Sequence, residues 1–349
     1  MSEKNNSTKV TADQQVAKIF EWRRGFNVVY LINIGLELGL FKYLERNPNS
    51  TPDNIATSLS LHAPFIDVWC KTAFAVGILG SDDCVQYHLE DHFDQLLAKE
   101  SHPRYLGGYI QLGTNFAAQD FKFCIEAFKG GDISPFQNRS DIFADTIGVA
   151  ISGLHMLTSK KLLPELPNME EKLKNSSKIL DIGCGTGRLV FQIAKHWPNA
   201  SVVGVDIDST GIKIARARSK ELGLENRVDL ILGDIGKAGN AASFDVVTLV
   251  EVLHEISPSI RQKAVSDCYK LLKPGGWILI VDETYPSKPH EFKMPEYQFP
   301  VQTAFEELTW GNVIPTKEIQ ENLLRTAGFD GRISRKIIGE GFTILETQK

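Results

Sequence analysis

The chain has 349 residues, of which 42% are hydrophobic and 23% are charged, and this balance excludes a mainly disordered, collagen-like or disulfide-scaffold protein. A net charge of −5 argues against nucleic acid and anionic membrane surfaces as partners. The length exceeds what one hydrophobic core usually organises, so we expect two domains, residues 1–167 and 168–349.

Cysteine usage and hydropathy indicate the cellular compartment. The five cysteines are widely spaced and form no CxxC pair, so we predict neither a zinc site nor a disulfide framework. The first fifteen residues are polar and lack the apolar core of a signal peptide. The longest charge-free stretches, residues 106–119 and 146–159, are too short to cross a bilayer. We therefore expect a cytoplasmic protein that makes no contact with a membrane.

The first predicted domain is helical. Residues 25–41 contain Glu37 as their only charged side chain, so we expect a helix that is buried on all sides. Thr51-Pro52-Asp53 has the composition of a helix start, and Pro64 opens another helix. A short hairpin is predicted over residues 78–89. The order of two helices and a hairpin is typical of a winged helix.

A winged helix also suggests a DNA-binding regulator, but the charge of this segment argues against one. Between Thr51 and Ala98, Lys71 is the only Lys or Arg against seven acidic residues. DNA binding requires basic side chains that neutralise phosphates. We therefore predict a module that binds protein, not DNA.

The second predicted domain alternates strands with helices. Further helices are expected over residues 105–163, and the polar, lysine-rich segment 165–177 is predicted to be the domain linker. The predicted strands then cover residues 178–182, 200–205, 228–232, 244–250, 277–281, 332–338 and 342–347. The predicted helices cover residues 188–196, 209–222, 258–272 and 316–327. This alternation indicates an α/β fold whose sheet is mostly parallel, with helices on both faces.

A glycine-rich turn follows the first of these strands. Asp181 precedes Gly183, Gly185 and Gly187, which gives the spacing GxGxG. A nicotinamide-binding loop would read GxGxxG, so this spacing argues against an oxidoreductase. A backbone without side chains lets an adenosyl ligand lie close over the strand end, and Asp181 would face a cationic group.

Two further loops complete the predicted nucleoside site. Asp206 ends the second strand, where an acid accepts hydrogen bonds from both ribose hydroxyls and repels a 2′-phosphate. Gly233-Asp234-Ile235 follows the third strand. Asp234 or a backbone amide beside it can meet the amino edge of adenine, while Ile207 and Ile235 pack against the faces of the ring.

These motifs, with residues 244–247 and the later Leu272–Gly276 turn, resemble the ordered motifs of class I S-adenosylmethionine-dependent methyltransferases. The resemblance covers about residues 177–349. It implies S-adenosyl-L-methionine as cofactor and a Rossmann-like domain: a doubly wound, mostly parallel sheet with an antiparallel last strand. The helical first half resembles the dimeric small-molecule O-methyltransferases, in which a winged-helix-like domain forms the homodimer and covers the substrate.

The resemblance also suggests catalytic residues. The segment from Glu251 to Glu255 resembles the family segment whose His acts as general base, so His254 is the candidate base and Glu251 a candidate cofactor contact. Residues 280–283 resemble the stretch whose Glu orients that His, which implies this role for Glu283. Glu255-Ile256 replaces the usual Asp-Trp pair.

The chemistry of the acceptor remains open at this stage. A phenol has a pKa of about 10, so a nearby imidazole helps to remove its proton, whereas a neutral amine or a thioether needs no base. Oxygen is the first choice and sulfur or nitrogen the second, and a non-catalytic cofactor-binding protein is a third reading. The remaining histidines show no ligand spacing, so no metal is predicted.

Overall fold

The structure, a computed structural model, describes residues 10–135, 137 and 139–349. The chain divides into two compact units, Met1–Thr114 and Asn115–Lys349, each described here by itself. Residues 1–9 lie outside the described residues. They belong to the polar N-terminal stretch from which a cytoplasmic protein was expected.

The first unit is helical, as predicted. Its elements are α1 (Ala12–Glu37), α2 (Leu40–Arg46), α3 (Pro52–Leu59), α4 (Ala63–Ala75), β1 (Leu79–Gly80), β2 (His88–Leu89) and α5 (Gly107–Leu112). Thr51 caps α3 by accepting the backbone N–H of Asn54, and Pro52 occupies the first turn, as the sequence predicts. The strands β1 and β2 form a short antiparallel pair.

The expectation of a helix buried on all sides over residues 25–41 is wrong. Helix α1 starts at a capping box between Thr11 and Gln14, runs without a break to Glu37, and leaves Ile34 and Phe26 exposed. The core of this unit covers only one side of the second half of α1. There Trp69 Nε1 donates to the carbonyl of Leu31 at 2.9 Å.

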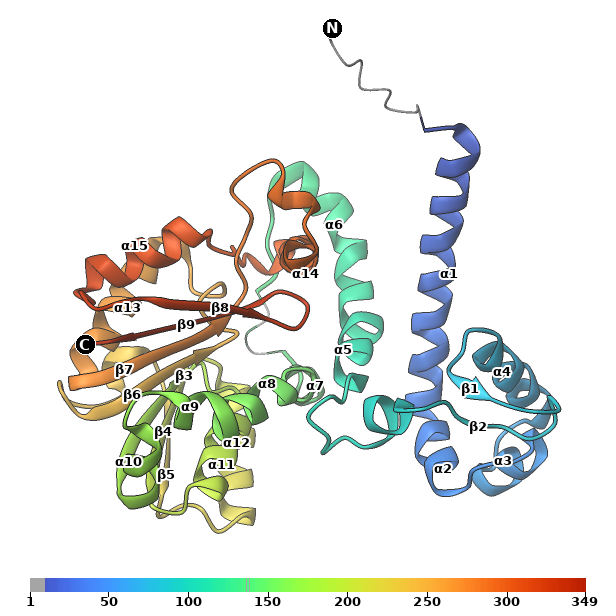
Figure 1. Cartoon of the computed structure of the whole chain (residues 1–349), viewed down its shortest axis with the longest axis horizontal. Coiled ribbons are helices and arrows are strands. Elements are labelled where there is room, and N and C mark those ends of the chain that lie inside the picture. Colours follow the sequence, from blue (N-terminus) through green and yellow to red (C-terminus); the bar gives the residue numbers. More distant parts are fainter. Residues whose placement is uncertain (1–9, 136, 138) are drawn as a thin grey trace, which may run out of the picture. The chain divides into compact units, whose positions relative to one another are not determined.

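The second unit contains the predicted mixed sheet (Figure 1). Its strands are β3 (Ser177–Ile182), β4 (Ala200–Asp206), β5 (Val228–Leu232), β6 (Phe244–Val250), β7 (Leu272–Asp282), β8 (Ser334–Ile338) and β9 (Phe342–Gln348). Their order is β5-β4-β3-β6-β7-β9-β8, and β9 runs antiparallel to its neighbours. The predicted fold class is therefore confirmed.

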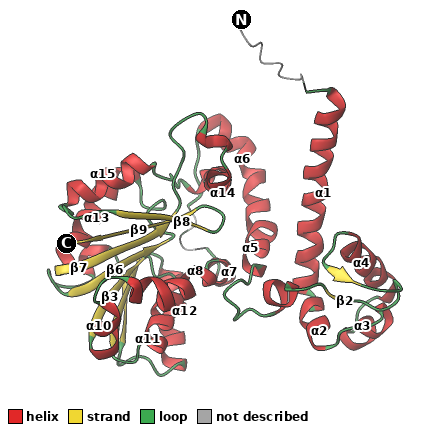
Figure 2. Cartoon of the chain, in the orientation of Figure 1, coloured by secondary structure: helices red, strands yellow, loops and turns green. Residues whose placement is uncertain are grey.

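Helices cover both faces of this sheet (Figure 2). The helices of the second unit are α6 (Ala118–Gly130), α7 (Asp141–Ala150), α8 (Ser152–Leu157), α9 (Leu163–Glu165), α10 (Met169–Asn175), α11 (Arg188–His196), α12 (Ser209–Glu221), α13 (Pro258–Leu271), α14 (Gln298–Glu306) and α15 (Lys317–Ala327). Helices α11 and α12 pack on one face, and α13 and α15 pack on the other. Strand β6 is buried along its whole length, which explains its continuous apolar sequence.

The units divide earlier than the boundary expected after residue 167. The predicted connector packs inside the second unit, because α7 contacts α12 and α8 contacts α11. The predicted linker is also ordered: Met169 and Leu173 on α10 are fully buried in the core of this unit. Lysine-rich composition marked an exposed helix face here rather than a flexible connection.

Within the described part of the chain, no single helix is long and apolar enough to cross a membrane. One helix pair, residues 141–150 and 152–165, reaches that length and composition but is bent by 54°.

Candidate active site

A cavity of about 560 Å³ opens at the carboxyl ends of the parallel strands in the second unit. It lies where the sheet order reverses between β3 and β6, the usual ligand position in such sheets. Helices α7 and α8 supply one wall, and the start of α13 supplies another. Eight of the predicted cofactor residues line the cavity: Gly183, Gly185, Asp206, Ile207, Gly233, Asp234, Ile235 and Glu251.

The glycine turn has backbone conformations that require glycine. Gly183, Gly185 and Gly187 have φ values of +67°, +49° and +77°. A Cβ on Gly183 would stand 2.4 Å from Val252, and one on Gly187 would stand 2.7 Å from Phe191. Gly187 lies outside the cavity lining, so it serves the close packing of the turn on α11 rather than a ligand.

Asp206 is fixed by the same turn. Its carboxylate accepts the backbone N–H of Gly185 and that of Asp208, each at 2.7 Å. Burial raises the pKa of Asp206, and these backbone donors oppose that shift. The neighbouring Asp208 has another task, because its side chain caps α12 through Thr210 and Gly211. Asp206 is thus a rigid acceptor at the cavity edge.

Two further predicted acids differ in position. Asp181 lies beneath the cavity rather than on its wall, accepts the Thr248 hydroxyl at 2.7 Å, and has a pKa raised to about 7 by burial. Glu251 lines the cavity and adopts a φ of +57°, which is uncommon for a residue with a side chain. Its Oε1 is buried without a hydrogen-bond partner, and burial raises its pKa well above the usual value.

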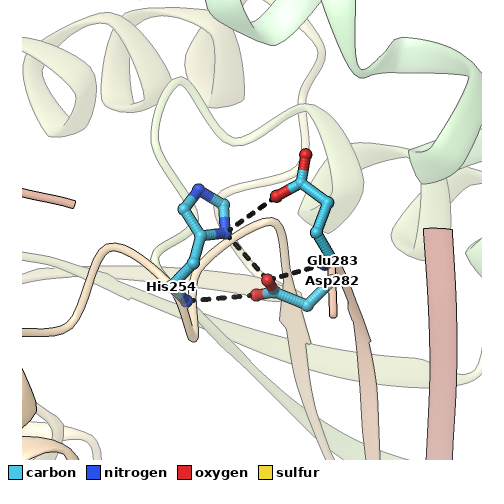
Figure 3. A group of neighbouring side chains, drawn as sticks. All are labelled: His254, Asp282 and Glu283. Carbon is cyan, nitrogen blue, oxygen red and sulfur yellow. Dashed lines mark hydrogen bonds and ion pairs between the residues drawn. The ribbon is translucent and has the colours of Figure 1, made fainter. Parts of the chain in front are cut away.

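His254 and Glu283 lie outside that cavity lining, in a buried cluster beside it (Figure 3). His254 follows β6, and Asp282 ends the adjacent strand β7. The imidazole Nδ1 lies 2.8 Å from Asp282 Oδ1 and 3.5 Å from Glu283 Oε2. Asp282, rather than the predicted Glu283, therefore makes the short contact that orients the ring.

Asp282 is itself held by the backbone. Its Oδ2 accepts the N–H of Leu253 at 2.7 Å, and its Oδ1 accepts the N–H of Glu283 at 2.8 Å. Asp282 was not among the predicted site residues, although it stands directly before Glu283 at the end of a strand. Glu307 was not predicted either, and its Oε2 lies 3.3 Å from the other ring nitrogen, Nε2. Because Glu307 lies far from His254 in the sequence, no local pattern indicates this second contact.

The carboxylates around the ring control its protonation. Burial opposes a charged imidazole, but Asp282, Glu307 and Glu283 outweigh it and raise the pKa of His254 well above its usual value. Burial also raises the pKa of Glu283 to about 8, while His254 opposes that shift. In this arrangement both ring nitrogens face carboxylates, which favour the charged imidazolium over the neutral ring.

The same cluster contains potential metal ligands. One ligand atom from each of His254, Asp282 and Glu283 lies within 4.8 Å of the others. The 2.8 Å contact between Nδ1 and Asp282 is a hydrogen-bond distance. The sequence-based expectation of no metal stays a prediction.

The comparison with protein families matches residues 179–276 to a methyltransferase domain. A ubiquinone biosynthesis O-methyltransferase of Thiobacillus denitrificans is 35% identical over 101 residues, which are 29% of this chain and 42% of that protein. The match thus spans about two fifths of that relative. A carboxy-S-adenosyl-L-methionine synthase of Wolinella succinogenes is 30% identical over 179 residues, 50% of this chain and 72% of that protein.

Similarity in structure extends over nearly the whole chain. Human N-acetylserotonin methyltransferase in complex with S-adenosylmethionine aligns with a TM-score of 0.77, covering 98% of this chain and 99% of that one at 16% identity. At this identity the alignment establishes the fold.

Proposed function

Because the chain belongs to the class I S-adenosylmethionine-dependent methyltransferase family, we propose that it transfers a methyl group from S-adenosyl-L-methionine to a hydroxyl of a small molecule. The observation that carries the proposal is the cavity in which the glycine turn and the fixed carboxylate of Asp206 meet. The printed activity of the O-methyltransferase relative supports oxygen as the acceptor atom.

The residues of the cavity fit the cofactor. Asp206 would accept the ribose hydroxyls, and the loop Gly233–Ile235 would receive adenine together with Ile207. Glu251 Oε1, which is buried without a hydrogen-bond partner, offers an acceptor for the cationic end of the cofactor. A cation there would favour the ionised carboxylate and lower the raised pKa of Glu251.

The bound cofactor would supply an electrophilic methyl group on a sulfonium, so the protein must mainly align the acceptor. In the proposed mechanism His254 is the general base. Asp282 holds Nδ1–H, which leaves Nε2 to take the proton of the hydroxyl. Because Glu307 lies 3.3 Å from Nε2, the acceptor must displace this carboxylate before proton transfer.

The occupied Nε2 and the raised pKa of His254 favour a second candidate function. A neutral amine or a thioether presents a free lone pair, so an N- or S-methyltransferase acting on such a group would work by proximity and need no base. In that case His254 would be a charged partner for the carboxylates around it. The base mechanism predicts a rate that rises with pH, whereas transfer by proximity predicts a flat pH profile.

The first unit supports the proposal of a homodimer. Apolar side chains along α1, including Ile19, Trp22 and Phe26, are more than half exposed. Exposed apolar surface of this kind is a frequent sign of an interface between copies of a chain.

The test is a screen of phenols, amines and thiols with labelled cofactor, followed by His254→Gln on the acceptor found. If a hydroxyl proton must leave, the variant loses roughly 10²–10⁴ in turnover, the usual value of general base catalysis. The wild-type rate should rise with pH through a midpoint above 6.5, because the raised pKa keeps His254 protonated at lower pH.

The affinity for S-adenosylhomocysteine should stay unchanged in this variant, since His254 lies outside the cavity. The exposed His196→Gln serves as the matched control and should behave as wild type. A loss below about threefold with a flat pH profile would reject the base role in favour of transfer by proximity.

A further inference from the structure

Arg261 is a buried, positively charged side chain that the proposed mechanism does not use. It lies close to the start of α13 and is 3% exposed. Burial of a charge is costly, and the positive N-terminal end of the helix dipole adds to that cost. A buried cation at the start of a helix therefore needs a specific reason, and its hydrogen bonds indicate one.

The guanidinium of Arg261 donates to three backbone carbonyls. Its Nε donates to the carbonyl of Ile256 at 2.9 Å. Its Nη2 donates to the carbonyl of His254 at 3.1 Å and to that of Val313 at 2.7 Å. The first two carbonyls belong to residues 252–256 after β6, here called the His254 loop. The third belongs to residues 307–313 after α14, so Arg261 connects two segments that lie far apart in the sequence.

The same two segments meet at the imidazole of His254. Glu307 Oε2 lies 3.3 Å from Nε2, and the side-chain amide of Asn312 donates to the same oxygen at 2.9 Å. The backbone N–H of Val313 donates to the carbonyl of His254 at 3.1 Å. One end of the 307–313 segment therefore contacts the ring of His254, and the other end contacts its backbone.

The His254 loop is held on both sides. Asp282 accepts the backbone N–H of Leu253 at 2.7 Å, whereas Arg261 donates to carbonyls of the same loop. Burial lowers the pKa of Arg261, and the charge of Asp282 opposes that shift. The guanidinium thus stands within electrostatic reach of the carboxylate that orients the ring.

We propose that Arg261 is a positioning residue for the methyl transfer, because its guanidinium fixes the 307–313 segment against the His254 loop. This inference rests on the proposed function, in which Nε2 of His254 receives the proton of the acceptor. A planar guanidinium holds carbonyls of two segments at once, which the flexible ammonium group of a lysine does not. The acceptor then meets one fixed arrangement of the ring and Glu307, and displacement of such groups reduces turnover sharply.

Chemical modification of histidines tests this role without an acceptor. Diethylpyrocarbonate acylates accessible imidazole nitrogens, and peptide mass spectrometry of the full-length protein gives the rate at each histidine. In wild type, His254 is 2% exposed and should react much more slowly than the exposed His196. Arg261→Met should raise the rate at His254 by about tenfold or more, because hydrogen bonds from a charged group no longer hold the segment that covers Nε2.

His155 distinguishes positioning from a general loss of structure. It is 7% exposed and lies in the cavity wall of the same unit, so its rate should rise only if the whole unit loosens. Unchanged protection of His254, or an equal rise at His254 and His155, would overturn the proposal. Arg227→Met is the matched control, because Arg227 also donates to two backbone carbonyls, but directly before β5. It should leave His254 protected.

Arg261→Lys separates the planar fork from the charge, and it replaces the methionine variant if that variant does not fold. The lysine keeps a positive charge near Asp282 but lacks the fork, so His254 should react as fast as in Arg261→Met. Full protection of His254 in the lysine variant would assign the effect to charge and reject the bracing of the two segments.

Turnover connects the contact with the reaction. On the acceptor found by the screen, Arg261→Met should lower kcat by about tenfold or more and leave the affinity for S-adenosylhomocysteine unchanged. Adding His254→Gln should cause no loss beyond that of His254→Gln alone, since residues that act through one group are not additive. Additive losses, or a wild-type kcat in Arg261→Met, would reject the inference. If wild type methylates no acceptor, the proposed function fails, whereas the protection of His254 still decides whether Arg261 fixes the segment.

Discussion

His254 illustrates how a few carboxylates decide what a single side chain can do. Asp282 fixes one ring nitrogen from a neighbouring strand, while Glu307 reaches the other from a segment 53 residues further along the chain. The first contact alone would produce an oriented base. The second holds the proton on the ring, so the acidity of the site depends on whether Glu307 stays in place.

Glu307→Gln should shift the pH dependence of turnover to lower pH. The carboxylate of Glu307 helps to raise the pKa of His254, so its removal lowers that pKa. The ring then loses its proton, and can act as a base, at a lower pH. The measurement is the pH profile of kcat for the wild type and the variant. Glu306→Gln, which removes the adjacent carboxyl group, is the control; an equal shift in both variants would rule out a specific contact.

Asp206→Asn tests the cofactor site at one carboxylate. The variant keeps the size of the side chain but loses its charge and one acceptor, so binding of S-adenosylhomocysteine should weaken about tenfold or more in calorimetry. Asp208→Asn is the matched control, because an asparagine still caps α12. Unchanged affinity in Asp206→Asn would show that Asp206 does not bind the ribose.

The sequence predicted those site residues that follow directly on a strand or belong to the glycine turn. Asp206 and Gly233 line the cavity as this reasoning expects, because parallel strands bring their carboxyl ends to one edge, whereas Glu251 was predicted from the family resemblance. Glu307 and His155 could not be found, because each reaches the site from a helical segment whose packing no local pattern encodes. Asp282 also ends a strand and could have been predicted, but the family resemblance assigned the contact with His254 to the adjacent Glu283.

Among the secondary-structure elements, prediction succeeded where hydrophobic pattern and tertiary burial agree. Strand β6 and helix α11 have their predicted bounds, because buried strands are continuously apolar and α11 begins at a glycine turn. Prediction failed at α1, which continues through Gly25, and at α10, where two apolar residues anchor a charged helix.

Asp245 at the start of β6 should contribute to stability in a pH-dependent way. It accepts the backbone N–H of Lys178 at 2.9 Å and the ammonium of Lys273 at 2.7 Å, so it ties β6 to β3 and β7. Burial acts to raise its pKa, but these partners outweigh it and the pKa is lowered. Stability from such a group is present above its unfolded pKa of about 3.9 and is lost as pH falls through the lower folded value.

Asp245→Asn should therefore reduce the free energy of unfolding by about 1–3 kcal/mol at pH 7 and by less at pH 3. Urea unfolding at the two pH values measures the difference. Asp229→Asn, an exposed acid on β5, is the control and should have little effect at either pH. A loss of the same size at pH 7 and pH 3 would assign the effect to packing instead of charge.

At the scale of the whole molecule, the two units divide their tasks. The cavity, the His254 cluster and the glycine turn all lie within Asn115–Lys349. Met1–Thr114 has its own hydrophobic core but leaves the first half of α1 with apolar side chains in solvent. The proposed homodimer would cover this surface with a second copy of the chain.

Replacing two apolar residues of α1 should therefore convert a dimer into a monomer. Ile19 and Trp22 are 60% and 63% exposed and stand three residues apart, so both lie on one face of the helix. The double variant Ile19→Glu, Trp22→Glu places two charges in the proposed interface without disturbing the core. Light scattering at micromolar concentration should give twice the chain mass for wild type and one chain mass for the variant.

Phe65→Glu is the matched control for this experiment, because Phe65 is also a large exposed apolar residue of the first unit but lies on α4. It should remain a dimer, since one substitution away from α1 leaves the proposed interface unchanged. Far-UV circular dichroism would establish that all three proteins keep their helices. A wild type that scatters as a monomer would exclude the α1 dimer, and a dimeric double variant would move the interface elsewhere on the chain.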